Sequence, residues 1–152
     1  MKTLLYVLSF SAIFAVSTSN AQSQEKCNFD CTLIKHLTSI QSRNYELLES
    51  TVTPDEEMTF ILPNGQYFED PLTFKKLIKE WFADTAWTFE YKIIRKFHSN
   101  SLGYALLLID YNEADRNGKP YHLDHYLSLV FQKKGERWYL VHDQNTKTQL
   151  KK

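Results

Sequence analysis

The sequence is poor in the residues that mark phosphate loops, metal clusters and disulfide frameworks. It holds four glycines, two cysteines and five histidines among 152 residues. The scattered glycines form no glycine-rich phosphate loop, and no Ser-His-Asp or Cys-His arrangement carries a local catalytic signature. These absences predict no cofactor and no metal site.

The chain also lacks an excess of charge of either sign. Its 18 basic residues balance its 18 acidic residues, which argues against the positive surface of a nucleic-acid-binding protein. Beyond the N-terminal segment there is no long apolar run, internal repeat or low-complexity tract. We therefore expect no nucleic-acid partner and no membrane attachment of the mature protein.

Residues 1–21 have the three parts of a secretory signal peptide. Lys2 supplies a positive charge, residues 4–16 form an apolar run, and small residues lead up to Ala21. The run is too short to span a bilayer comfortably, which disfavours a membrane anchor. Lipid attachment needs a cysteine directly after the cleavage site, but Cys27 lies further on. We expect cleavage after Ala21 and a periplasmic or secreted protein, in which residues 22–30 precede the folded domain.

Cys27 and Cys31 are the two cysteines of the chain, and they stand four residues apart. An exported protein meets an oxidising compartment, so a disulfide between them is plausible at the entry into the first helix. A redox role is less favoured, because their spacing is one residue longer than in a Cys-x-x-Cys motif.

The roughly 130 residues after the signal peptide are enough for one domain with one core, which we place at residues 31–148. Helical spacing of apolar residues predicts an amphipathic helix, or a bent pair, over residues 31–50. A short strand is predicted over 58–62 and an irregular connection over 66–69. Asp70 before a proline predicts a helix that ends near residue 84. Residues 87–97 alternate as a strand.

Residues 102–146 alternate between apolar and polar side chains in three long runs. Asn117-Gly118 is a strong hairpin signal, because both positions of a type I′ turn have positive φ. A second turn is predicted at Lys134-Gly135. Together the turns predict a three-stranded antiparallel meander with one buried face. The side chains predicted on that face are Tyr104, Leu106, Leu108, Leu127, Leu129, Phe131, Trp138 and Leu140.

This register places polar side chains at one end of the apolar face. Asp110 lies opposite His125, His125 lies opposite Gln144, and a turn near residue 100 brings Tyr91 opposite Asp110. Buried polar groups need a partner, water or a ligand. A polar cluster at the end of an apolar face is typical of a ligand cleft. The predicted ligand-binding residues are Trp87, Phe89, Tyr91, Asp110, His125, His142 and Gln144.

The order of elements and the closing segment resemble the nuclear transport factor 2-like superfamily, in particular its SnoaL-like members. The last strand of that family commonly carries a Trp, an aliphatic residue, two His and a Ser or Thr at alternate positions. Trp138, Leu140, His142 and Thr146 match this pattern, whereas Gln144 stands where the second His often lies. The resemblance implies an α+β fold in which a curved antiparallel sheet of four long strands and a short one wraps around N-terminal helices.

The resemblance also implies a cone-shaped α+β barrel with a pocket inside. Relatives include ketosteroid isomerase, polyketide cyclases, dehydratases and many members without catalytic activity, so the fold does not decide the function. Whether this protein is an enzyme is left open.

Three functions fit the sequence. The first is a binding module that holds a small, mostly apolar molecule, with Asp110, His125, Tyr91 and Gln144 orienting its polar end. The second is a proton-transfer enzyme of isomerase, cyclase or dehydratase type, in which His125 or Asp110 is the general base and Tyr91 donates to an oxyanion. The third is a structural protein without a ligand, in which Asp110 and His125 are a cross-strand pair and the outer sheet face forms a homodimer.

Overall fold

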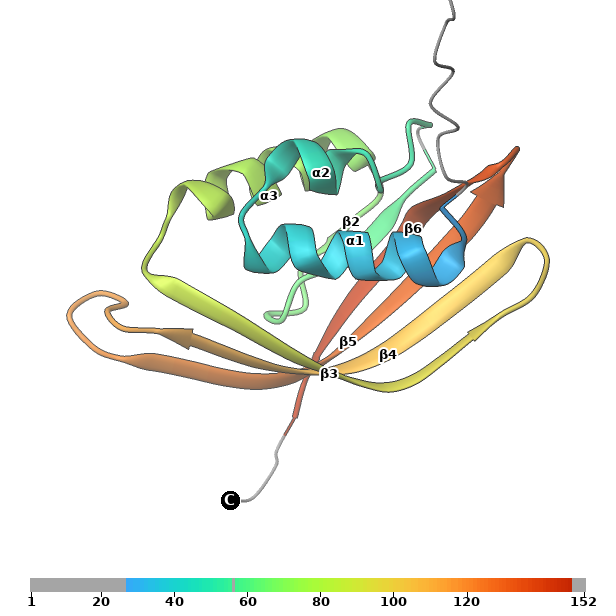
Figure 1. The fold of residues 1–152 in the computed structure, drawn as a ribbon. Coiled ribbons are helices and arrows are strands. Elements are labelled where there is room, and N and C mark those ends of the chain that lie inside the picture. The colour runs from blue at the N-terminus through green and yellow to red at the C-terminus, as the bar shows by residue number, and fades with distance from the viewer. Residues whose placement is uncertain (1–26, 56, 149–152) are drawn as a thin grey trace, which may run out of the picture.

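A computed structural model describes residues 27–55 and 57–148 of the chain. The predicted signal peptide lies outside these residues. Three helices and a six-stranded sheet make up the described part (Figure 1). The predicted α+β fold class is confirmed. Within the described part, every helix is too short or too polar to cross a membrane.

The first helical region is a bent pair of helices, α1 (Phe29–Gln41) and α2 (Tyr45–Glu49). Each begins at an asparagine whose side chain accepts a backbone N–H of the first turn: Asn28 from Cys31, and Asn44 from Leu47, both at 2.9 Å. Such caps satisfy amide groups that the helix itself cannot pair. The bend between the helices therefore coincides with a second capping residue.

The helix α3 (Pro71–Ala83) begins as the sequence predicts. Asp70 Oδ1 accepts the Thr73 amide at 2.6 Å, and Pro71 occupies the first turn, where its missing N–H costs nothing. Phe74 and Phe82 are buried, whereas Leu72 on the opposite side is 76% exposed. One stripe of α3 therefore faces the sheet.

The sheet has the strand order β2-β1-β6-β5-β4-β3, with β2 and β3 at its two open edges. The connection predicted to be irregular over residues 66–69 contains the short strand β2, which pairs antiparallel with β1. The strands β4, β5 and β6 form the predicted three-stranded antiparallel meander, β3 pairs antiparallel with β4, and β1 joins β6 in parallel. The strands are β1 (Thr59–Ile61), β2 (Tyr67–Phe68), β3 (Trp87–His98), β4 (Leu102–Glu113), β5 (Tyr121–Lys134) and β6 (Arg137–Lys147).

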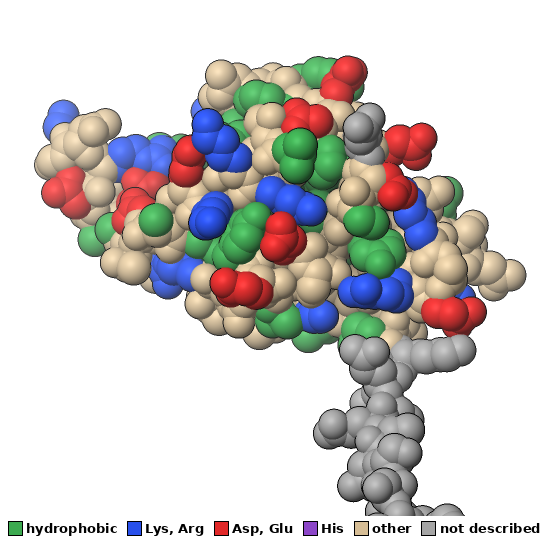
Figure 2. All heavy atoms as spheres, turned by 90° about the horizontal axis from the view of Figure 1, so that it is seen from above, with side chains coloured by type: hydrophobic (Ala, Val, Ile, Leu, Met, Phe, Trp, Pro, Cys, Tyr) green, Lys and Arg blue, Asp and Glu red, His purple; other side chains and the backbone are tan. Residues whose placement is uncertain are grey.

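The sheet is strongly curved, and all three helices lie over its concave face (Figure 1). The core forms between these two layers. It includes Leu33 and Leu37 of α1, which are fully buried against the sheet. Seen from above, basic and acidic side chains are interspersed over the helical side of the molecule (Figure 2).

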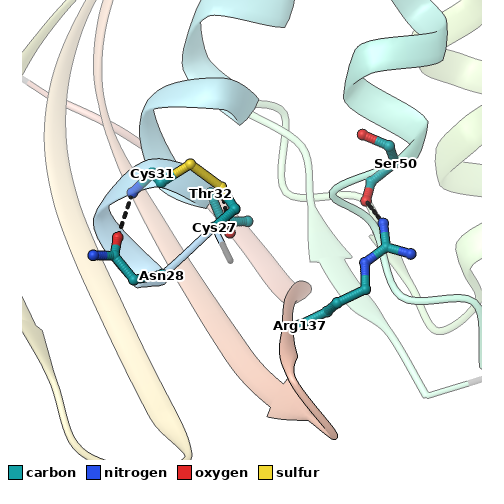
Figure 3. Close-up of a disulfide and its surroundings, with 6 residues drawn as sticks. All are labelled: Cys27, Asn28, Cys31, Thr32, Ser50 and Arg137. Carbon is teal, nitrogen blue, oxygen red and sulfur yellow. Dashed lines mark hydrogen bonds between the residues drawn. A yellow bond between two sulfur atoms is a disulfide. The ribbon is translucent and has the colours of Figure 1, made fainter. Parts of the chain in front are cut away.

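Cys27 and Cys31 form a disulfide directly before and within the first turn of α1 (Figure 3). Their Cα atoms lie 5.2 Å apart, within the range that a disulfide spans without moving the backbone. Nearby, Arg137 at the start of β6 donates to the Ser50 carbonyl at 3.4 Å, so the first residue of β6 is also tied to the end of α2 (Figure 3).

The turn between β4 and β5 forms as predicted, but the register behind it does not. Asn117 and Gly118 both have positive φ, and Arg116 N donates to the Lys119 carbonyl at 2.7 Å. Behind this pair, two residues of the β4 side oppose Pro120 alone. Proline has no N–H for the strand ladder, so it favours such an irregularity.

This extra residue moves β4 by one position relative to β5. Ile109 lies opposite His125, and Asp110 lies opposite Asp124. Because side chains alternate, a shift of one residue exchanges the two faces. The prediction for the buried face of β4 is therefore wrong: Tyr104, Leu106, Leu108 and Asp110 lie outside, and Gly103, Ala105, Leu107, Ile109 and Tyr111 are buried.

The second hairpin turn lies one residue later than predicted. Lys134 pairs with Arg137, and Gly135 in the turn has a φ of 61°. The later turn shifts the pairing of β5 with β6 by an even number of residues. Because side chains alternate, the same side chains of these strands remain on the buried face. The predicted burial of the neighbouring strands is confirmed for Leu127, Leu129, Phe131, Trp138 and Leu140.

A bulge at Val141 reverses the faces of β6 beyond that point. The bulge inserts one extra residue, so the odd-numbered side chains that follow it point inward. Asp143 is buried on the inner face. His142 and Gln144 lie on the outer face, which corrects their predicted position, and His125 pairs with Lys147 instead of Gln144.

A third irregularity interrupts β3 at Ile94. Phe97 lies opposite Tyr104 and is 61% exposed. Beyond the bulge, Tyr91 lies opposite Ile109 instead of the predicted Asp110. The inner side chains before the bulge are Trp87, Phe89, Tyr91 and Ile93.

Candidate functional site

A cavity of about 540 Å³ lies between α3 and the concave face of the sheet. A cavity of this volume has the size of a small-molecule site. α1, the segment that follows β1, and the four long strands also contribute to its lining. Most of the wall is apolar: Ile40, Phe60, Leu62, Phe74, Ile78, Trp81, Phe89, Leu123 and Leu127.

One side of the cavity carries a chain of hydrogen bonds that ends in an ion pair. Trp81 Nε1 donates to Tyr111 Oη at 3.3 Å, and Tyr111 Oη donates to Glu113 Oε1 at 2.5 Å. Arg116 donates twice to the same carboxylate and covers the Tyr121 ring at 3.5 Å. Burial and the bond to Glu113 raise the pKa of Tyr111 to about 12. The polar groups on this side of the cavity are therefore paired with one another and carry no net charge.

The inner face of β6 places a buried carboxyl group in the cavity. Asp143 is 8% exposed, and its Oδ1 accepts from Asn145 Nδ2 at 2.8 Å. The same amide nitrogen donates to the Ile61 carbonyl at 3.0 Å, which fixes Asn145 between two strands. Burial raises the pKa of Asp143 to about 7, because the charged form loses its water. This carboxyl group can therefore hold or release a proton near neutral pH.

His125 lies on the neighbouring strand and also lines the cavity. Its side chain is buried, and Nδ1 has no hydrogen-bond partner among the described residues. Burial lowers the pKa of His125, so the imidazole is neutral at physiological pH. Lys147 is its direct partner across β5 and β6 and lines the same cavity.

The family model of the SnoaL-like domain matches residues 32–145, which is most of the chain. The chain belongs to the SnoaL-like domain family. The predicted resemblance is thereby confirmed. No curated protein matches this chain in sequence.

Solved structures share the fold of this SnoaL-like domain at low sequence identity. A Caulobacter vibrioides protein with a cystatin-like fold has a TM-score of 0.66 at 12% identity, over 80% of this chain and 87% of that chain. A nuclear transport factor 2-like superfamily protein from Salmonella enterica has a TM-score of 0.62 at 18% identity, over 76% and 85%. An LEH-like epoxide hydrolase from M. tuberculosis has a TM-score of 0.57 at 9% identity, over 77% and 80%.

Two of the predicted ligand-binding residues, Phe89 and His125, line the cavity of the SnoaL-like domain. Trp87 lies directly behind the wall: its ring stacks on Trp81 at 4.2 Å, and its Nε1 donates to the Trp81 carbonyl at 3.0 Å. Tyr91 lies on the inner sheet face and packs against the core beside Phe89, outside the cavity lining.

The other three predicted residues lie on the outer face of the sheet. His142 Nδ1 is 2.6 Å from Thr59 Oγ1, and Gln144 Nε2 donates to Thr146 Oγ1 at 3.5 Å. Asp110 and His125 lie on opposite faces, so the pair that both the catalytic and the structural hypotheses used does not form.

Asp110 instead joins a small polar group on the outer face. His122 Nε2 lies 3.2 Å from an oxygen of Asp110 and 3.2 Å from an oxygen of Asp124. The three ligand atoms lie within 4.8 Å of one another, close enough for a metal ion to bind all three. In the structure His122 bridges two carboxylates that oppose each other across the strands, which relieves their repulsion.

His125 was predicted to line the cavity, but the polar cavity groups that β6 contributes were not predicted from the sequence. Asp143, Asn145 and Lys147 alternate along the last strand, but the alternation starts after the bulge at Val141. Their common spacing of two was the available signal, and it competed with the matching spacing of His142 and Gln144. The bulge decides between the two sets, and sequence alternation does not reveal a bulge.

Proposed function

We propose that this SnoaL-like domain binds a small, mostly apolar molecule in the cavity between α3 and the sheet. The cavity of about 540 Å³, with its aromatic wall and few polar groups, is the observation that carries this proposal. Asp143 and His125 give the bound molecule hydrogen-bonding partners at two positions along the cavity wall. One structural neighbour, from M. tuberculosis, is an LEH-like epoxide hydrolase, which supports a ligand in this fold.

A pair of tryptophan substitutions on α3 tests binding. Ile78 lines the cavity, whereas Leu72 on the same helix is 76% exposed. Ile78→Trp fills the cavity, and Leu72→Trp adds the same ring on the outside. We expect wild type and Leu72→Trp to bind Nile red with increased fluorescence, and Ile78→Trp to lose at least tenfold in affinity. Equal binding by both variants would place the dye elsewhere and contradict the proposal.

A second candidate function is proton transfer, and the environment of Asp143 favours it. A carboxyl group whose pKa lies near 7 is suited to act as a general acid or base. His125 lines the same cavity four residues further along β5, because Asp143 pairs with Leu129 and His125 pairs with Lys147. In this function Asp143, not Asp110, is the general base.

Exchange of the α-protons of 2-tetralone in D2O, followed by NMR, tests this second function. We expect the wild-type protein to accelerate the exchange, and Asp143→Asn to abolish the acceleration while it still binds the ketone. Asp110→Asn on the outer face is the matched control. Exchange at the buffer rate with wild-type protein would leave binding as the function.

We propose further that the protein is exported and cleaved after Ala21. The disulfide between Cys27 and Cys31 supports this, because disulfides persist in oxidising compartments. The mass of the protein purified from the periplasm or medium checks the cleavage site. A full-length mass, or retention in the cytoplasm, would contradict export.

A homodimer through the outer sheet face is our proposal for a protein partner. The register of β4 and β5 places apolar side chains there, including Leu106, Leu108, Tyr126 and Val130. Leu106→Lys should convert a dimer to a monomer in light scattering, whereas Leu72→Lys on α3 should not. A monomeric wild-type protein at high concentration would exclude this partner.

A further inference from the structure

The cavity contains a positive charge that the described residues leave unpaired. Glu113 neutralises Arg116 in an ion pair. Burial raises the pKa of Asp143 to about 7, so this carboxyl group is mostly protonated at pH 6. Lys147 also lines the cavity, and its ammonium makes no ion pair with a described residue. The Lys147 ammonium therefore remains as a positive charge on the cavity wall at pH 6.

A buried imidazole lies beside this charge. His125 pairs directly with Lys147 across β5 and β6, and the Cβ atoms of such pairs are about 5 Å apart. His125 is 5% exposed, and its Nδ1 lacks a partner among the described residues. A buried polar atom without a partner is unfavourable, and a ligand oxygen at this position would remove the penalty.

The remaining polar side chain near this position is already occupied. Both N–H groups of the Asn145 amide are directed to protein acceptors, the Ile61 carbonyl and Asp143. The unsatisfied buried atom is therefore Nδ1 of His125, and the exposed Lys147 side chain lies beside it on the same face of the sheet. Two donors in this arrangement match the two oxygens of a carboxylate.

We propose that the cavity selects amphipathic carboxylic acids, with the carboxylate between Lys147 and His125 and the apolar body against Phe74, Trp81 and Phe89. This inference rests on the proposed binding function and names its ligand class. The carboxylate accepts from the ammonium of Lys147 and from the Nδ1–H of His125, which is otherwise without a partner among the described residues.

Matched acids and amides test the ligand class on the full mature protein at pH 6, where the acids are ionised. The probes are 2-naphthoate with 2-naphthamide, and decanoate with decanamide, measured by isothermal titration calorimetry. We expect each acid to bind about tenfold more tightly than its amide, the size of one charge-assisted contact. Lys147→Met should remove this difference by weakening the acids alone, and Lys147→Arg should restore it. Lys119→Met, in the β4–β5 turn, is the control for net charge.

The possible outcomes separate this inference from the function on which it rests. Equal affinities of acid and amide for the wild-type protein would overturn the selection of acids and leave the binding function intact. An equal loss of both ligand types in Lys147→Met would do the same. If neither the acids nor the amides bind, and Nile red does not bind either, the binding function fails together with the inference.

Discussion

Gly103 of β4 lies so close to Phe29 of α1 that a side chain has no room between them. A Cβ atom built on Gly103 would lie 2.5 Å from two carbons of the Phe29 ring. The ring itself is held by Phe131 and Trp138, whose centroids lie 5.9 and 5.5 Å away. The first turn of α1 therefore rests directly on the backbone of the sheet.

Gly103→Ala should destabilise the protein by about 1–3 kcal/mol, because the Phe29 ring must move within a packed core. Urea unfolding measures the change. The double variant with Phe29→Leu should lose less than the sum of the two single variants, since the smaller side chain makes room for the methyl group. Additive losses would show that the clash is not the cause.

Arg43 connects the bend between α1 and α2 to the start of β3. Its guanidinium donates to the carbonyls of Asp84, Thr85 and Trp87 and covers the Trp87 ring at 4.0 Å. Arg43 also has a φ of 53°, which disfavours any residue with a Cβ atom. One residue thus combines stabilising contacts with a strained backbone.

The two contributions of Arg43 can be separated by two variants. Arg43→Ala should lose about 2–3 kcal/mol with its charged hydrogen bonds. Arg43→Gly loses the same contacts but relieves the backbone, so it should be more stable than Arg43→Ala by about 1 kcal/mol. Thermal unfolding of both variants checks this order. A glycine variant that is no better than the alanine variant would show that the positive φ costs nothing.

The sequence was sufficient for the class of fold because long alternating runs and turn residues act locally. It was insufficient for the face of β4. From Tyr104 to Ile109 every side chain is apolar or aromatic, so alternation does not distinguish the two faces there. The choice depends on the number of residues between paired positions at the turn, where two residues of the β4 side oppose Pro120 alone. A single backbone irregularity therefore decides which side chains are buried.

Only part of the candidate site was predictable from the sequence, because backbone irregularities again decide which side chains point inward. His125 follows from the inward alternation of β5, and Phe89 from that of β3. Asp143 and Lys147 depend on the bulge at Val141, and Trp81 on the packing of α3 over the sheet. These are tertiary features, and local sequence patterns do not encode them.

Asp143 should make the stability of the protein fall as the pH rises. Its pKa is raised from 3.8 to about 7 in the folded state, so the folded protein holds a proton that the unfolded chain has lost between these values. Stability therefore decreases from about pH 4 to pH 7 and then levels off. Asp143→Asn should be more stable than wild type by a few kcal/mol at pH 8 and equal to it at pH 4.

Urea unfolding across this pH range measures the effect of Asp143. Glu57→Gln, a carboxylate-to-amide change at an exposed residue that makes no ion pair with the described residues, is the control and should leave the wild-type profile unchanged. If the free energies of unfolding of wild type and Asp143→Asn change in parallel with pH, the pKa of Asp143 is not raised.

His36 should make the stability of the protein fall as the pH decreases. It is fully buried in α1, and burial lowers its pKa from 6.5 to about 4. The hydroxyl of Thr51 donates to the Leu48 carbonyl at 2.6 Å, so it accepts from His36 Nδ1–H at 2.8 Å, and Nε2 is left without a partner among the described residues. Below pH 6.5 the unfolded chain binds a proton that the folded protein excludes, and stability falls by up to about 3 kcal/mol at pH 4.

His36→Leu in the Asp143→Asn background isolates this acid sensitivity. The leucine removes the imidazole with its unpaired Nε2, so the variant should match its parent within about 1 kcal/mol at pH 7 and exceed it in stability at pH 4.5. Thr51→Val in the same background removes the hydrogen bond but keeps the imidazole, and it should retain the full loss of stability in acid. If both substitutions flatten the profile equally, the hydrogen bond and not the buried imidazole controls the response to acid.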